Sequence, residues 1–280
     1  MKEMAAPMTE EPLSGRPGAG TEAIVILGGF MSMSALYSNM RMALVQLTGQ
    51  PVYVVETCSA EWLAGIVPAG WLHVLRRLDR TVRMAERQTA SGRITLIGHS
   101  AGGVLGRLYL SPSRFLGQGH RGLASVGRLI TLGSPHYNRR HWIHGGMMAR
   151  WVNDRVPGAC FAPDVQYCSV AGKMVRGERH GSLRERHAFR FYDQIGGTGK
   201  AWGDGLVPVA SALLAGSQHI VLEGVGHFAF SGSCWYGSKE SIAAWWPACQ
   251  SESRRRSASR SGQEPTAHQA GLELGLPDQM

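Results

Sequence analysis

The chain has 280 residues, of which 44% are hydrophobic and 18% charged, and a formal net charge of +9. This composition supplies a core for one large domain or two small ones, and it excludes a globally disordered protein. No run approaches the roughly 20 apolar residues that a membrane-spanning helix requires. The first residues lack the apolar stretch of a secretory signal, so we expect a cytoplasmic protein.

The chain divides into three regions by composition. Residues 1–22 are rich in Pro, Gly and Glu without periodicity, and we expect them to be disordered. Residues 23–249 alternate apolar runs with amphipathic stretches and form the predicted folded domain. Residues 250–280 are polar and contain a serine–arginine run, so they are predicted to be a disordered tail.

Short β-rich runs recur in the predicted domain, and most are continuously apolar, which is typical of strands buried on both faces of a parallel sheet. They lie at 23–27, 52–55, 94–97, 129–132, 165–170 and 220–222. Helical patterns lie between them. Residues 71–87 place Leu72, Leu75, Leu78, Val82 and Met84 near one stripe, and 101–110 and 238–246 are also predicted helices. This alternation predicts an α/β sandwich whose chemistry lies at the carboxyl ends of the strands.

The positive charge is concentrated in residues 136–200, which contain eleven basic and five acidic side chains. Such a field draws anionic substrates or an anionic membrane surface toward a protein, although solvated arginines on an arginine-rich protein are the simpler interpretation. No nucleic acid is expected as a partner, since the basic residues form no stripe interleaved with aromatic side chains.

Cysteines are few and scattered. The five, none of them in a CxxC pair, are Cys58, Cys160, Cys168, Cys234 and Cys249. This spacing is not typical of a disulfide framework or a cysteine-based zinc site, so we expect ordinary buried thiols.

The strongest motif is Gly98-His99-Ser100-Ala101-Gly102, directly after the run ITLI and before a predicted helix. This is the G-x-S-x-G nucleophile elbow in its strand–turn–helix context. The turn is so tight that side chains two residues on either side of the serine would collide, which explains the glycines. Ser100 is the predicted nucleophile, and the helix that begins behind it favours developing negative charge.

A serine hydroxyl needs a base, and the base needs a third group to orient it. Asp204 lies in the glycine-flanked loop WGDGLVP, and His227 follows the run IVL in GVGHF. The order serine, acid, histidine is the one expected after such an elbow. We therefore predict His227 as general base and Asp204 as its orienting acid. Asp193 and Glu223 are the alternative acids, in a charged stretch and too near His227, respectively.

An acyl-transfer site also needs backbone donors for an oxyanion. One should be the amide of Ala101, the residue after the nucleophile. The other is predicted at Phe30, in the loop Leu27-Gly28-Gly29-Phe30-Met31, where an ordinary Gly-Gly turn is the alternative. This loop lacks the signatures of a phosphate-binding loop. His136, at another strand end, is predicted to line the pocket.

With these residues in place, the chain resembles a lipase/esterase-type serine hydrolase of the α/β-hydrolase superfamily. It is particularly similar to the lipase-like α/β-hydrolases of cyanobacteria and plant chloroplasts. The matching strings include LGGF at 27–30, GHSAGG at 98–103, TLGSPH at 131–136, WGDGLVPVASALL at 202–214 and WYGS at 235–238. The resemblance implies the α/β-hydrolase fold, a mostly parallel central sheet flanked by helices, and the triad Ser100, Asp204 and His227. One departure is Gly28-Gly29, where many members carry His-Gly.

The predicted function is cleavage of a small-molecule or lipid carboxylic ester through an acyl-enzyme, without cofactor or metal. An acyltransferase with the same triad and a non-catalytic binding scaffold are the alternatives. Residues 137–160 are interpreted as a small cap-like insertion, with substrate-binding side chains at Trp142, Met147 and Met148 and arginines for an anionic head group or membrane surface. A loop that packs its own Trp and Met side chains is an equal alternative.

Overall fold

The computed structural model describes residues 22–59, 62, 67–138, 146–229 and 234–261. Its centre is a six-stranded sheet in the order β2-β1-β3-β4-β5-β8, and every neighbouring pair is parallel. The strands are β1 (Ala23–Leu27), β2 (Val52–Val54), β3 (Ile94–His99), β4 (Val126–Leu132), β5 (Gln166–Lys173) and β8 (Gln218–Glu223). All six predicted strands are therefore present, and they form the predicted parallel sheet.

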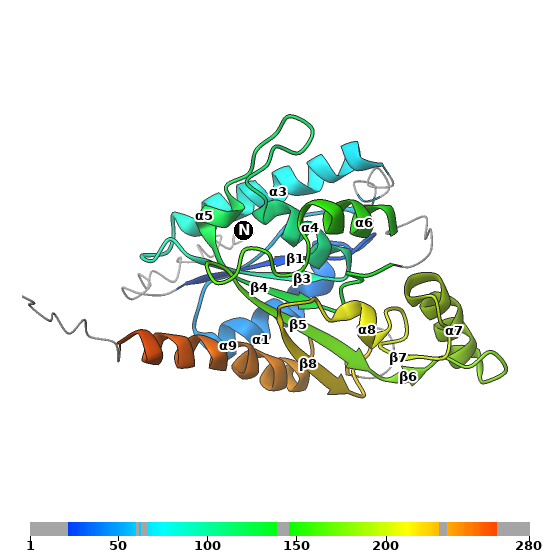
Figure 1. Ribbon diagram of the computed structural model, residues 1–280. Coiled ribbons are helices and arrows are strands. Elements are labelled where there is room, and N and C mark those ends of the chain that lie inside the picture. Colours follow the sequence, from blue (N-terminus) through cyan, green and yellow to red (C-terminus); the bar gives the residue numbers. More distant parts are fainter. Residues whose placement is uncertain (1–21, 60–61, 63–66, 139–145, 230–233, 262–280) are drawn as a thin grey trace, which may run out of the picture.

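Helices cover both faces of the sheet (Figure 1). One face carries α3 (Pro68–Glu86), α4 (Ala101–Leu110), α5 (Gly122–Ser125) and α6 (Gly146–Arg155). The other face carries α1 (Ser38–Thr48), preceded by the 3-10 turn η1 (Ser34–Tyr37), and α9 (Lys239–Ser261). The chain is thus an α/β sandwich of three layers.

The central strands are buried on both sides, which explains why their sequences are continuously apolar. All five residues of β1 are buried. Successive side chains of a strand point to opposite faces, so Val25 packs with the core of α3 and α4, whereas Ile24 and Ile26 pack with the core of α1 and α9. The edge strand β8 alternates between half-buried and exposed residues instead.

In helix α3, the hydrophobic periodicity of the sequence predicts most of the buried residues but fails in the last turn. Leu75, Leu78 and Val82 are buried as predicted, but the prediction for Met84 was wrong, since its side chain is 44% exposed. Ala85 occupies the buried position in that turn. Residues three and four apart share a helix face, so Ala85 continues the stripe from Leu78 and Val82, and Met84 lies outside it.

Helix α9 continues to Ser261, into the segment 250–280 that the sequence predicted to be a disordered tail. The chain has no glycine or second proline between Pro247 and Gly262, so the two residue types that most disfavour a helix are absent from this stretch. Residues 1–21 and 262–280 lie outside the described residues.

The cap-like insertion predicted at about 137–160 is described in part. Its central helix α6 packs against α4, with Met148, Ala149 and Val152 buried in the core that α3 and α4 share. Residues 139–145 lie outside the described residues.

A second excursion joins β5 to β8 at the carboxyl end of the sheet (Figure 1). It contains the antiparallel pair β6 (Val175–Arg176) and β7 (Trp202–Gly203), the helix α7 (Leu183–Gly196) between them, and the short helix α8 (Val209–Ala212). A capping box starts α7, in which Ser182 accepts from the Glu185 amide and Glu185 accepts from the Ser182 amide. We call residues 175–203 the β6–α7–β7 module.

The expectation of unpaired thiols was wrong for two cysteines. Cys168 on β5 and Cys249 on α9 form a disulfide with their Cα atoms 5.8 Å apart, across 81 residues of sequence. Spacing in the sequence could not show this pair, because it depends on how α9 packs against β5. Within the described part of the chain, no helix is long and apolar enough to cross a bilayer.

Candidate active site

Ser100 lies between β3 and α4, in the strained conformation expected of a nucleophile elbow. Its φ of 53° and ψ of −126° place a non-glycine residue in a sparsely populated region. The flanking glycines allow the close approach. A Cβ on Gly98 would lie 2.4 Å from Cα of Gly103, and a Cβ on Gly102 would lie 2.4 Å from the carbonyl oxygen of Leu27. Ser100 is only partly buried, at the N-terminus of a wholly buried helix.

The loop that follows β1 lies directly against Ser100. A Cβ on Gly29 would be 2.7 Å from the Cβ of Ser100 and 3.3 Å from its Oγ, so only glycine fits there. The Ser32 amide donates to the Gly29 carbonyl oxygen at 3.1 Å, closing a turn over Phe30 and Met31, and Met31 has a φ of 59°. The structure therefore brings the predicted oxyanion loop to the predicted nucleophile.

Asp204 is buried, and four donors surround its carboxylate. Oδ1 accepts from the amides of Leu206 at 3.0 Å and Val207 at 2.7 Å, and Oδ2 accepts from Tyr236 Oη at 2.8 Å and from His227 Nδ1 at 2.7 Å. These hydrogen bonds fix the carboxylate in one orientation. Among the described residues, Asp204 is thus the acid that contacts His227.

Tyr236 is a member of this site that the sequence did not predict. Its hydroxyl donates to Asp204 and accepts from the Gly172 amide at 2.7 Å, and burial together with the neighbouring carboxylate raises the pKa of this phenol well above its usual value. The string WYGS marked this segment as part of the resemblance, but nothing in it indicated a contact with Asp204.

His227 is 1% exposed and has one engaged ring nitrogen. Since a carboxylate only accepts, Nδ1 donates the hydrogen bond to Asp204, and in the neutral tautomer with that donor Nε2 carries a lone pair. This Nε2 is buried without a hydrogen-bond partner among the described residues. Buried polar atoms are usually paired, so an orphaned basic nitrogen beside the elbow is suited to accepting a proton from a reacting group.

A buried hydrogen-bond chain connects the Gly29 loop to His227. The Gly29 amide donates to Tyr37 Oη at 3.0 Å, Tyr37 Oη lies 2.8 Å from His99 Nδ1, and His99 Nε2 lies 3.2 Å from the carbonyl oxygen of His227. Because a carbonyl only accepts, Nε2 is the donor and Nδ1 accepts from Tyr37. Burial, with the neighbouring His227 second, lowers the pKa of His99 well below its usual value. The sequence predicted that His99 packs or hydrogen-bonds nearby, but it gave no signal for Tyr37.

His136, which we expected to line the pocket, is fully buried in a different network. Its Nε2 lies 3.1 Å from Thr131 Oγ1, its Nδ1 lies 3.3 Å from Arg107 Nη1, and its carbonyl accepts from Asn153. Both ring nitrogens are therefore engaged inside the protein. Burial, and secondarily the charge of Arg107, lowers the pKa of His136 well below its usual value.

Of the other residues predicted in the pocket, the structure describes Met147 and Met148, and it does not bring these two together. Met147 on α6 is exposed, whereas Met148 is buried in the core, and Trp142 lies outside the described residues. The alternative acids lie elsewhere, since Glu223 pairs with Lys173 at 2.8 Å and Asp193 is on α7. Exposed apolar side chains do flank the site, because Met31 is 47% and Phe228 is 37% exposed.

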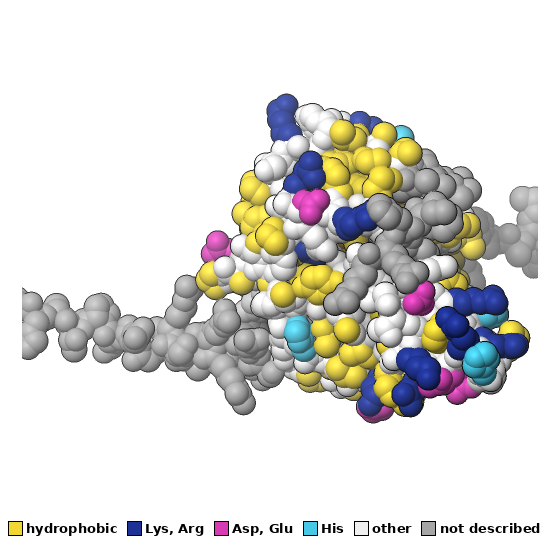
Figure 2. Space-filling model, turned by 45° about the vertical axis from the view of Figure 1, so that its right-hand side comes forward, with side chains coloured by type: hydrophobic (Ala, Val, Ile, Leu, Met, Phe, Trp, Pro, Cys, Tyr) yellow, Lys and Arg dark blue, Asp and Glu magenta, His cyan; other side chains and the backbone are white. Residues whose placement is uncertain are grey.

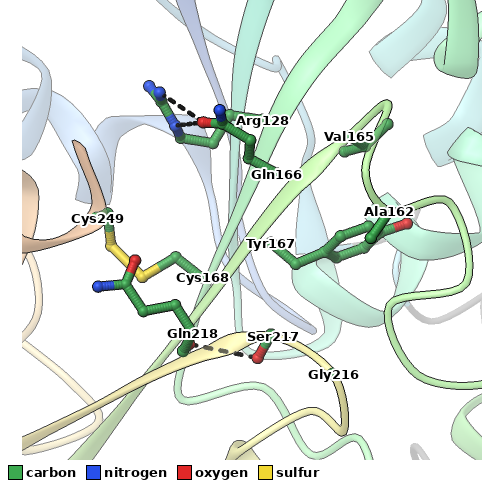
Figure 3. Close-up of a pocket in the computed structure, with 10 residues that line it drawn as sticks. All are labelled: Arg128, Ala162, Val165, Gln166, Tyr167, Cys168, Gly216, Ser217, Gln218 and Cys249. Atoms are coloured by element: carbon green, nitrogen blue, oxygen red, sulfur yellow. Dashed lines mark hydrogen bonds between the residues drawn. A yellow bond between two sulfur atoms is a disulfide. The ribbon is translucent and has the colours of Figure 1, made fainter. Parts of the chain in front are cut away.

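One cavity lies away from Ser100, near the amino ends of β4 and β5. It has a volume of about 120 Å³ and includes Arg128, Gln166 and the disulfide of Cys168 among its lining residues. Figure 3 shows Gln166 accepting from Arg128 on one side, with Tyr167 pointing away from both. These groups do not converge on one point. Among the described residues, no cluster of three or more His, Cys, Asp and Glu could hold a metal ion.

No protein-family profile and no curated protein sequence matches the chain. Solved structures are similar, however. The mature form of the lipase BlEst2 from Bacillus licheniformis superimposes with a TM-score of 0.57 at 17% identity, over 85% of this chain and 96% of that lipase. The chain has the α/β-hydrolase fold. The propeptide form of BlEst2 gives a TM-score of 0.54 at 14% identity, over 94% of this chain and 55% of the other.

Proteins with the α/β-hydrolase fold carry their nucleophile on the turn between a strand and a helix, followed along the chain by an acid and a histidine. Ser100, Asp204 and His227 stand in that order, at the carboxyl ends of β3, β7 and β8. At 17% identity the likeness to BlEst2 is one of fold, so the chemistry must be argued from the site itself.

Proposed function

We propose that this protein is a serine hydrolase that cleaves a carboxylic ester through an acyl-enzyme. Two observations carry the proposal: Ser100 is held in a strained turn, and the buried His227 has its Nδ1 fixed by Asp204 and its Nε2 without a partner among the described residues. Such an arrangement is suited to taking a proton from a serine hydroxyl.

In the first half-reaction, His227 Nε2 accepts the hydroxyl proton of Ser100 while Oγ attacks the ester carbonyl carbon. The amides of Ala101 and Phe30 stabilise the resulting oxyanion, helped by the N-terminus of α4. The tetrahedral intermediate then expels the alcohol, which takes the proton from His227. In the second half-reaction a water molecule gives its proton to His227 and attacks the acyl carbon, and Ser100 leaves with that proton.

The acyl group is proposed to be apolar. Met31 and Phe228 flank the site and are exposed, and their neighbours Phe30 and His227 belong to the proposed machinery. Apolar side chains at the entrance gain free energy when they contact an acyl chain, by about 0.8 kcal/mol for each buried methylene. A lipid or medium-chain ester therefore suits the site better than an acetyl ester.

The first experiment is intact-mass analysis after incubation with a fluorophosphonate, with the modified peptide mapped. One adduct on Ser100, absent from Ser100→Ala, is expected. Ester hydrolysis should fall by on the order of 10⁶-fold in Ser100→Ala and by less in Asp204→Asn, because Asp204→Asn retains both the nucleophile and the base. Folded protein that takes no adduct would instead indicate a binding scaffold. Ester exchange with an added alcohol that outpaces hydrolysis would indicate an acyltransferase.

A second experiment addresses the acyl chain, with a series of nitrophenyl esters from acetyl to dodecanoyl. Met31→Asn makes the entrance polar, and Asn tolerates the positive φ at this position. We expect KM for the longer esters to rise several-fold with little change for acetyl ester. Met42→Asn is the matched control, because Met42 is similarly exposed but lies on α1. Equal effects of the two variants would rule out an apolar entrance at Met31.

A further inference from the structure

The β6–α7–β7 module carries a net positive charge. Between residues 175 and 203 the chain has six Lys or Arg and three Asp or Glu side chains. Figure 2 shows these basic side chains gathered at one end of the molecule. The charge predicted for 136–200 is thus partly concentrated on a single structural unit.

Only part of this charge is neutralised within the module. Glu178 lies 3.6 Å from Arg176 and 3.9 Å from Lys200, and the carboxylate of Glu185 caps the first turn of α7. Among the described residues, neither Arg186 nor Arg190 forms an ion pair. Both are exposed. They lie four residues apart on α7, where like charges repel, so their proximity costs stability in the free protein.

These two arginines belong to one face of α7. Leu183, Arg186, His187 and Arg190 follow the spacing i, i+3, i+4, i+7 and are all exposed, whereas Ala188, Tyr192 and Ile195 form the buried face. Leu183 is 63% exposed. We call Leu183, Arg186, His187 and Arg190 the basic face. It combines cations with one exposed apolar side chain at its N-terminal end.

The module is tied directly to the loop of Asp204. Tyr192, on the buried face of α7, accepts the Gly205 amide at 2.8 Å and donates to the Val175 carbonyl oxygen. The Met174 amide donates to the Gly203 carbonyl oxygen at 2.8 Å, next to Asp204. A surface that docks on α7 is therefore held at a fixed position relative to the site. Figure 1 shows α7 at the end of the molecule toward which β5 points.

We infer that the basic face docks the protein on an anionic lipid bilayer. Arginines attract the headgroups of anionic lipids, and an exposed leucine beside them gains free energy when it leaves water for the acyl boundary. The phosphates of a nucleic acid would attract the arginines but would offer no apolar contact to Leu183. Docking would place the site at the surface that holds lipid esters, and this part of the inference rests on the proposed function.

The test is cosedimentation of the full chain with vesicles, using Ser100→Ala so that no lipid is consumed. The probe is phosphatidylcholine containing about 30% phosphatidylserine, with pure phosphatidylcholine as the comparison. Binding to the mixed vesicles alone is expected, and it should weaken as salt rises from about 0.1 M to about 0.5 M. Equal binding to both vesicle types, or to neither, would overturn the inference.

The matched variants remove the same charge at two places. Arg186→Gln/Arg190→Gln should weaken vesicle binding about 30-fold, since each basic side chain near an anionic surface contributes about fivefold. Arg114→Gln/Arg121→Gln removes two exposed arginines from the connection between α4 and β4 and should bind within about twofold of the parent. Equal losses in the two variants would show a net-charge effect without a docking face.

Leu183→Ser tests the apolar contact and separates a bilayer from a polyanion. It should weaken vesicle binding by about tenfold, as expected for one buried leucine, and leave binding to a DNA oligonucleotide unchanged. Tighter binding to the oligonucleotide than to vesicles would show that the face recognises another partner. In the background of native Ser100, fluorophosphonate labelling should be the same in both arginine variants. Failure of that labelling would therefore count against the proposed function and not against docking.

Discussion

His99 Nε2 donates to the carbonyl oxygen of His227 at 3.2 Å, which joins the residue before the elbow serine to the proposed general base. The same imidazole accepts from Tyr37, whose oxygen accepts from the Gly29 amide. The backbone of the proposed base and the loop of the proposed oxyanion donor are thus held by one buried chain of hydrogen bonds. The proposed reaction requires both groups to be fixed before it begins.

Tyr37→Phe removes the middle link of this chain without emptying the core. We expect kcat to fall by roughly 5- to 100-fold with a smaller change in KM, because a lost buried hydrogen bond of about 1–3 kcal/mol loosens groups that act in the transition state. The measurement is ester hydrolysis normalised to the sites that fluorophosphonate titrates.

Tyr109→Phe is the matched control, since the buried Tyr109 donates to Asp79 far from the site. It should lower stability comparably and leave kcat unchanged. His99→Gln, which retains a donor and an acceptor, should keep more activity than His99→Leu. If Tyr37→Phe loses only stability, the chain has no part in positioning.

Gly102 and Gly106 give a second prediction, because they lie one turn apart on α4 and differ in what surrounds them. A Cβ on Gly102 would meet the backbone oxygens of Leu27 and Gly28 at 2.4 and 2.5 Å, whereas a Cβ on Gly106 would meet a side-chain methyl of Leu129 at 3.0 Å. Gly102→Ala should lower the free energy of unfolding by several kcal/mol, because backbone must move. The free energy of unfolding of Gly106→Ala should be within about 1 kcal/mol of that of the parent, because the higher helix propensity of alanine offsets the tighter packing against Leu129. Urea denaturation measures both free energies of unfolding. Comparable decreases in Gly102→Ala and Gly106→Ala would contradict this account.

The sequence predicted the parts of the fold and site that depend on local pattern. Buried parallel strands are continuously apolar, so the six strands could be found, and the elbow glycines are required by a local turn that Ser100 occupies. Tyr37, Tyr192 and Tyr236 could not be found, because each reaches a site loop through tertiary packing and carries no local signature. The disulfide of Cys168 was missed for the same reason.

Stability should decrease as the pH falls below about 6.5. Burial lowers the pKa values of His99 and His136, so these rings stay neutral in the folded protein at a pH where they are protonated in the unfolded chain. The unfolded state then binds more protons, and the free energy of unfolding falls with decreasing pH by up to about 1.4 kcal/mol per pH unit for each ring. The loss continues until the pH reaches the lowered pKa values.

The variant His136→Gln tests the contribution of the His136 ring to this pH dependence. Its free energy of unfolding, measured by urea denaturation between about pH 5 and pH 7, should change with a slope smaller than that of the parent by the contribution of one histidine. Gln can replace both hydrogen bonds of the ring. Parallel slopes in parent and variant would show that His136 is not held neutral in the folded protein.

The last prediction concerns the disulfide between Cys168 and Cys249, which fastens α9 to β5. Both cysteines are buried in the folded protein. The disulfide stabilises the fold because it restricts the conformations of the unfolded chain. Cys249→Ser should lower the free energy of unfolding of oxidised protein by roughly 2–4 kcal/mol, and thiol reduction should remove the difference between variant and parent. Cys160→Ser, which changes an exposed cysteine outside the disulfide, is the control and should leave stability unchanged. Alkylation of the unreduced, unfolded chain should leave these two cysteines unlabelled, and their labelling would show that no disulfide forms.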